Sequence, residues 1–205
     1  VAGTPVAQVV QITGRPYKAG MWNSICLPFA MTAEQIAATF GTGTKVGTLT
    51  RGETINEELI LDFNTTVTAM EAGVPYIIYP GSNTDISDAV KYNDVTITVS
   101  APQNYTVDDV QFFGAFGTLW GNYNEYPQNS YGLAENNTIY EIDHGTKLSG
   151  FRSIFVWTKS GAAPAPKRVR LIINGEQTAT NLGEMTISAQ ATKMIENGQV
   201  VIIKN

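Results

Sequence analysis

Cysteine and histidine are almost absent, because the 205 residues contain one of each. One thiol cannot close an internal disulfide, and one thiol with one imidazole cannot supply the ligands of the usual zinc sites. Cys26 lies in an apolar run, so we expect a buried, unreactive thiol. His144 lies in a predicted turn, where a solvent-facing side chain is a simpler interpretation than a catalytic base. With no phosphate loop or Gly-x-Ser-x-Gly motif either, the sequence predicts a protein that is not an enzyme.

Charge and long apolar runs are scarce too. Charged residues make up 15% of the chain and the net charge is -5, whereas about 25% charged residues is typical. No basic stripe is present to neutralise phosphates, which argues against nucleic acid as a partner. No apolar run approaches the roughly 18 residues that a transmembrane helix needs, so no membrane span is expected. The chain starts at Val1 without a signal peptide, and we interpret it as a mature or excised part of a longer protein.

The sequence does contain a series of short apolar, β-branched or aromatic runs. Each run is bounded by Gly, Pro, Asn or Asp, which is typical of strands in a packed sandwich. Asn-Gly pairs at 174–175 and 197–198 predict tight hairpin turns. The predicted fold class is all-β, a two-sheet antiparallel β-sandwich of jelly-roll or immunoglobulin-like type. Strands are predicted near residues 22–29, 59–63, 75–79, 95–99, 112–118, 138–142, 151–157 and 168–174.

Helix signals are few. Residues 32–35 match a capping box, apolar residues continue to Phe40, and Gly41 ends the pattern, so one short helix is expected there. A weaker helical turn is predicted at 87–90. We predict a β-sandwich domain over residues 1–180, followed by a small C-terminal β-hairpin, or the start of a truncated tail, over 181–205. The boundary is expected within 178–184.

Four segments of the chain resemble a module that recurs near the C-terminus of secreted multidomain proteins of the Bacteroidetes, especially those of Prevotella and Bacteroides. They are W-N-S-I-C-L-P-F at 22–29, A-G-V-P-Y-I-I at 72–78, F-G-A-F-G-T at 113–118 and G-F-R-S-I-F at 150–155. The last 15 residues, 191–205, also resemble the start of a cell-surface sorting tail. The resemblance implies a secreted or cell-surface β-sandwich beside a catalytic or adhesive domain. It implies no particular activity and no functional residues.

Acidic residues are candidates for two kinds of chemistry. Glycoside hydrolysis needs two facing carboxyl groups, and the pairs considered are Glu57 with Asp62, Asp108 with Asp109, and Glu125 with Glu141. Because 18 acidic residues produce such pairs by chance, a hydrolase is only the third interpretation. Calcium prefers oxygen ligands, and weak candidates for it are Asn83, Asp85, Asp88 and Asp94. Turns and a helix cap explain these residues equally well, and no other cofactor is expected.

The most unusual segment is 119–132, in which four aromatic residues alternate with Asn, Gln, Gly and Pro. Rings stack on the C–H faces of sugars, and amide and carboxylate groups bind the hydroxyls, so this composition suits a glycan site. The alternative is that Trp120 and one or two tyrosines turn inward and close one end of the sandwich. The predicted ligand-binding residues are Trp120, Asn122, Tyr123, Glu125, Tyr126, Gln128 and Tyr131. Trp22 and Trp157 lie in apolar strands and are expected in the core.

These observations favour a non-catalytic accessory module that binds a polysaccharide, from a plant or a host, through the 119–131 loop. The alternative is a structural or adhesive spacer whose partners are the neighbouring domains of a longer polypeptide.

Overall fold

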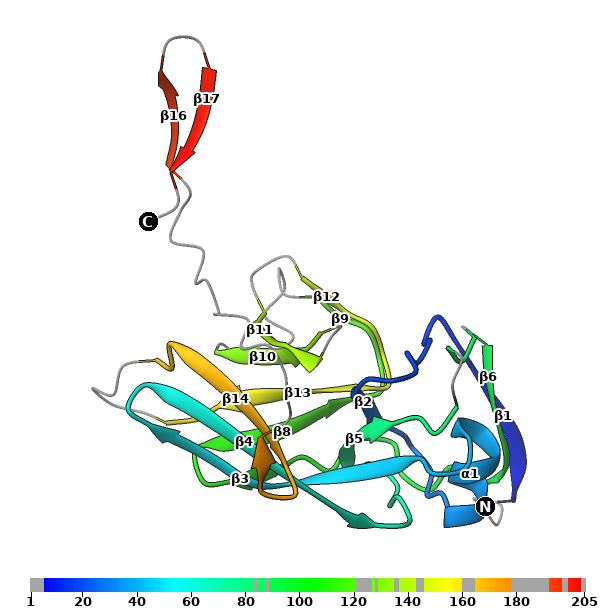
Figure 1. The fold of residues 1–205 in the computed structure, drawn as a ribbon. Helices are drawn as coiled ribbons and strands as arrows, with labels where there is room; N and C mark the ends of the chain where they lie inside the picture. Colours follow the sequence, from blue (N-terminus) through cyan, green and yellow to red (C-terminus); the bar gives the residue numbers. More distant parts are fainter. Residues whose placement is uncertain are drawn as a thin grey trace.

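The structure is a computed structural model. It describes residues 6–82, 85–87, 89–120, 127, 129–134, 137–142, 146–159, 165–177, 192–196 and 199–203. Strands form most of it, and two main sheets pack face to face, so the predicted all-β sandwich is confirmed (Figure 1). Within the described residues, no helix is long and apolar enough to cross a membrane.

The first sheet has six strands. From edge to edge they are β15 (Glu176–Gln177), β14 (Arg168–Ile173), β4 (Glu58–Val67), β3 (Lys45–Ile55), β5 (Pro75–Tyr79) and β2 (Asn23–Cys26). All pairs are antiparallel except β14 with β4, which is parallel. Arg170 donates two hydrogen bonds to Glu58 across that pair, at 2.6 and 3.1 Å. This one parallel pair makes the first sheet mixed, while the two sheets together are mainly antiparallel, as predicted.

The second sheet has five strands and is antiparallel throughout. Its order is β11 (Ile139–Glu141), β10 (Ser130–Leu133), β13 (Arg152–Trp157), β8 (Val110–Ala115) and β7 (Tyr105–Val107). Three smaller pairs complete the part of the chain that the structure describes: β1 (Gln8–Thr13) with β6 (Ala89–Val95), β9 (Leu119–Trp120) with β12 (Lys147–Leu148), and β16 (Thr192–Glu196) with β17 (Gln199–Ile203).

The main core lies between the two large sheets. Phe63 of the first sheet packs edge-on against Phe112 and Phe155 of the second, with ring centroids 5.8 Å apart in both pairs. Trp22 and Trp157 belong to this core and are each 6% exposed, which confirms their predicted burial. Rings of this size remove a large apolar area from water, so this cluster is the main source of sandwich stability.

A second core lies at one end of the sandwich, where helix α1 (Ala33–Phe40) and the β1–β6 pair cover the outer face of β2 and β5 (Figure 1). The predicted capping box is present, since Thr32 and Gln35 exchange both cap hydrogen bonds. Helix α1 buries Ile36 and Phe40 in this core. Because β5 is covered on both faces, its sequence is a continuous apolar run and does not alternate.

Two local predictions were wrong, and several strands were missed, among them β7 and β10. The strand expected at 95–99 is the end of β6 followed by a single bridge at Ile97, and the weak helical turn at 87–90 is where β6 begins. Strands β1 and β3 were not predicted. Strand β3 contains Gly47 and Gly52, residues that usually weaken strands. Both are required here, because a Cβ atom would lie 2.8 Å from Ile77 or 2.6 Å from Val110.

Both predicted hairpin regions contain paired strands. Asn174 and Gly175 adopt the positive φ angles expected of the turn between β14 and β15. Strands β16 and β17 are antiparallel, while the Asn-Gly pair between them lies outside the described residues. The division into domains at 180/181 stays a prediction, because residues 178–191 also lie outside the described part.

Candidate functional site

Most of the predicted glycan-binding loop lies outside the described residues. This holds for Asn122, Tyr123, Glu125, Tyr126 and Gln128, and for the side chain of Trp120, the last residue of β9.

Tyr131 is described, and its assignment to the site was wrong. Tyr131 lies in β10, is 1% exposed and packs in the core between the sheets. Burial raises the pKa of its phenol to about 12. Strand β10 pairs with β13, so its alternate residues face the core, and a ring buried there cannot stack on a sugar.

The calcium candidates are not brought together. Asp85 accepts hydrogen bonds from Lys18 Nζ at 3.0 Å and from the Ala19 amide at 3.1 Å. These bonds, with the one from Lys18 the larger cause, hold its pKa below the usual range. Asp94 lies near the far end of β6, about 17 Å along the strand from its first residue, Ala89. Asn83 and Asp88 lie outside the described residues, and the described part contains no cluster of metal-ligating side chains.

Three of the carboxylates considered for hydrolysis, those of Glu57, Asp108 and Asp109, have structural partners. Glu57 binds Lys167 at 2.8 Å, and the strand between it and Asp62 separates them by about 15 Å, beyond the range of about 5–10 Å for catalytic pairs. Asp108 and Asp109 accept hydrogen bonds from the amides of Gly52 and Thr54, which fastens the β7–β8 turn to β3. Glu125 and His144 lie outside the described residues.

Cys26 is buried and free, as predicted. Its thiol donates a hydrogen bond to the Gly73 carbonyl at 3.2 Å. Burial raises the pKa of the thiol to about 12, so the reactive thiolate is disfavoured. The side chain is a packing residue.

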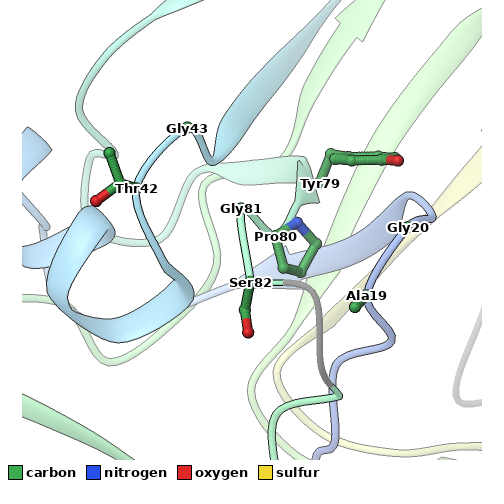
Figure 2. Close-up of a pocket in the computed structure, with 8 residues that line it drawn as sticks. All are labelled: Ala19, Gly20, Thr42, Gly43, Tyr79, Pro80, Gly81 and Ser82. Atoms are coloured by element: carbon green, nitrogen blue, oxygen red, sulfur yellow. The ribbon is translucent and has the colours of Figure 1, made fainter.

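The structure reveals a pocket that the sequence analysis did not predict. It has a volume of about 350 Å³ and lies where three turns meet. Figure 2 shows these turns: one precedes β2, one follows helix α1, and one follows β5. The lining residues are Ala19, Gly20, Thr42, Gly43, Tyr79, Pro80, Gly81 and Ser82. We call this the Tyr79 pocket.

Hydrogen bonds fix two of the three turns against each other. The Ser82 amide donates to the Phe40 carbonyl at 3.1 Å, and the Gly81 amide donates to Thr44 Oγ1 at 2.9 Å. The backbones also touch directly, because a Cβ atom on Gly81 would overlap the carbonyl oxygen of Thr42. This wall is therefore formed before any ligand arrives, which lowers the entropic cost of binding.

Tyr79, the last residue of β5, is the one aromatic residue among the described residues that line the pocket. Tyr79 is half-buried and packs edge-on against Trp22, with ring centroids 5.4 Å apart. Trp22 is held in turn, since its amide donates to Asn137 Oδ1 at 2.6 Å. The ring is thus braced from behind while part of its surface stays accessible.

The lining is polar and uncharged. Its residues are Tyr79 and Pro80, the hydroxyl-bearing Thr42 and Ser82, Ala19 and three glycines. Figure 2 shows the side chains of Tyr79, Thr42 and Ser82 pointing in different directions from their turns. Among the residues that the structure describes, no carboxylate, imidazole, amine or guanidinium group lines it. Such a lining can bind a neutral polar molecule, but it offers no strong acid–base pair.

The turn residues gave a signal that was interpreted only in part. Gly41 was identified as the end of a helix, and Pro80 and Gly81 as the boundary of a strand. Sequence patterns mark turns as such, whereas the meeting of these two turns depends on contacts between residues about 40 positions apart.

No protein-family model, curated protein or solved structure matches this chain. Its function must therefore be inferred from the chemistry of its own surface.

Proposed function

We propose that this chain is a non-catalytic module of a secreted or cell-surface bacterial protein, and that it binds a glycan in the Tyr79 pocket. The observation that supports this most directly is the composition of the lining: a half-buried tyrosine braced by Trp22, together with threonine, serine and glycine residues, and no ionisable acid–base pair among the described residues.

Each component of the lining corresponds to a part of a sugar. The C–H face of a pyranose packs on an aromatic ring, and its hydroxyls need hydrogen-bond partners when water is removed. Thr42, Ser82 and the glycine backbones bring donors and acceptors to the pocket. Its volume of about 350 Å³ falls at the lower end of ligand sites, which range over about 300–1,000 Å³. The pocket therefore suits one small polar ring.

The expected affinity is modest. One aromatic contact contributes about 0.5–1.5 kcal/mol beyond area burial, and each net hydrogen bond contributes about as much. After the cost of ordering the ligand, the dissociation constant falls in the range of about micromolar to millimolar. Such weak binding is useful in a module that holds a longer protein on a repeating polymer, because several weak contacts act together.

The test is a screen of immobilised and soluble polysaccharides with the full chain, followed by titration of the glycans retained. Tyr79→Ala removes the ring and should weaken binding about tenfold, as expected for the loss of about 1.4 kcal/mol. Tyr79→Phe keeps the ring and should retain most of the affinity. Tyr140→Ala is the matched control, since Tyr140 is a partly exposed tyrosine on β11, outside the pocket.

Trp120→Ala and Tyr126→Ala, tested in parallel, examine the loop that the sequence predicted. If these variants lose binding while Tyr79→Ala does not, the site lies in the loop and the pocket proposal is wrong. If no glycan binds the unmodified chain, the spacer interpretation replaces it.

A further inference from the structure

A second pocket also borders the turn that follows helix α1. It has a volume of about 250 Å³ and shares Gly43 with the Tyr79 pocket. It is bordered by helix α1 and by strands β3 and β4. The residues that line it are Ala33, Ile36, Ala37, Gly41, Gly43, Thr44, Lys45, Val46, Thr65, Val67 and Thr68. We call this the Lys45 pocket.

The residue that lines both pockets is Gly43, which has no side chain. Gly43 has a φ angle of +84°, and no atom lies within 4 Å of the place where a Cβ would stand. The space above Gly43 is therefore open, so a chain-like ligand can cross the turn from one pocket to the other. Two pockets that meet at a bare glycine suit a linear polymer better than two separate small molecules.

The chemistry of the Lys45 pocket differs from that of its neighbour. Its floor is apolar, with Ile36, Val46 and Val67, and its one charged residue is Lys45. Lys45 is exposed and forms no ion pair among the described residues. Lys18, Lys159 and Lys167 each bind a carboxylate, whereas Lys91, which is exposed on β6 and lies outside both pockets, also forms no ion pair among the described residues. The ammonium group of Lys45 is available to a ligand.

We infer that the two pockets form one binding groove for an acidic oligosaccharide, with a neutral sugar in the Tyr79 pocket and a carboxylate or sulfate group of the next sugars at Lys45. This inference rests on the proposed function and defines its ligand class. The net charge of the chain is -5, so its overall field repels a polyanion, and selection has to come from the local contact with Lys45.

The experiment is calorimetric titration of the full chain with three sets of oligosaccharides of matched length: neutral galactose oligomers, galacturonate oligomers and sulfated galactose oligomers. Each set includes a monomer and a tetramer, because only a ligand of several sugar units can occupy both pockets at once. The variants are Lys45→Gln, Tyr79→Ala and the control Lys91→Gln, which removes an exposed lysine from β6.

We expect an acidic tetramer to bind about two- to fivefold more tightly than the neutral tetramer, which is the contribution of one ion pair at an exposed surface. Lys45→Gln should abolish that preference and leave the neutral tetramer unaffected, while Lys91→Gln should change neither. Added salt should weaken the acidic tetramer alone. The carboxylate and sulfate sets decide which anion is preferred.

Failure of the groove inference can be distinguished from failure of the proposed function. If Tyr79→Ala weakens binding but Lys45→Gln leaves the acidic and neutral affinities unchanged, the groove inference is wrong and the glycan proposal stands. If monomers bind as tightly as tetramers, the second pocket is not used and the groove inference is again wrong. If none of the three sets binds and the screen also finds no glycan, the proposed function fails together with the inference.

Discussion

Gly114 of β8 lies where the two sheets approach each other closely, and replacing it tests that approach. A Cβ atom at this position would overlap the Sγ atom of Cys26 in β2, and it would lie 3.1 Å from the Cβ of Cys26 and 3.2 Å from that of Pro102. The sulfur has little freedom to move, because Cys26 is fully buried and its thiol donates a hydrogen bond to the Gly73 carbonyl. Gly114→Ala should therefore force the sheets apart or strain both strands.

The magnitude follows from two opposing effects. Inserting a methyl group into a packed core costs about 1–3 kcal/mol. Alanine restores about 0.5–1 kcal/mol relative to glycine through backbone entropy, since the φ angle at Gly114 is not in the left-handed region. A net loss of about 1–2 kcal/mol is expected. Cys26→Ala alone should cost about 1–2 kcal/mol through lost burial, and it removes the sulfur atom that the methyl group added at position 114 would meet.

The two changes should therefore not be additive. The free energy of unfolding is measured in guanidinium chloride for the wild type, both single variants and the double variant. The loss in the double variant should be smaller than the sum of the two single losses by at least about 1 kcal/mol. Gly117→Ala is the control, because no atom lies within 4 Å of a Cβ there and stability should barely change. Additivity within about 0.5 kcal/mol would show that β2 and β8 do not meet at these residues.

Three further predictions concern stability. Burial raises the pKa values of Cys26 and Tyr105 to about 12, from 9.0 and 10.0. Because the native state therefore keeps these protons to higher pH than the unfolded state, the denaturant midpoint of unfolding should fall as the pH rises from about 8 to about 11. A midpoint that stays constant over this range would contradict the prediction. Thr32→Ala removes the N-cap of helix α1 and should cost about 1 kcal/mol, whereas Thr32→Ser should be nearly neutral; equal losses in both would exclude a capping role. Limited proteolysis should cut within 178–184 and leave a stable core, and a tail that resists cleavage and is needed for folding would refute the separate C-terminal unit.

The sequence by itself determined those features that depend on neighbouring residues. Thr32 and Gln35 are three positions apart, so their capping box forms within one helical turn and could be predicted. The turn at Asn174 and Gly175 likewise follows from local backbone preferences. The all-β class followed from many short apolar runs, because each requires burial on one or both faces.

The burial of a residue could be predicted where the residue lies in an entirely apolar run. The prediction failed where the segment mixes aromatic with polar residues. Cys26 and Trp157 lie in apolar runs and are buried as expected. Tyr131 stands among polar and glycine residues that suggest a loop, and its burial depends on pairing between β10 and β13. Alternation over four residues is too short to show which face of a strand meets a core.

Only the tertiary structure decided how distant segments meet. The parallel pairing of β14 with β4 joins residues about 110 positions apart, and nothing local to Arg170 specifies Glu58 as its partner. Strand β3 was missed because Gly47 and Gly52 weaken strands locally, while the close approach of Ile77 and Val110 requires them.

The candidate site also depends on contacts between segments that are distant in the sequence. The turns at Gly41–Thr44 and Tyr79–Ser82 are each visible in the sequence, but the Tyr79 pocket exists only because hydrogen bonds hold one turn against the other. Local propensity fixes where a chain turns. The packing of the sheets on the two main cores fixes which turns become neighbours, and that packing is a property of the whole chain.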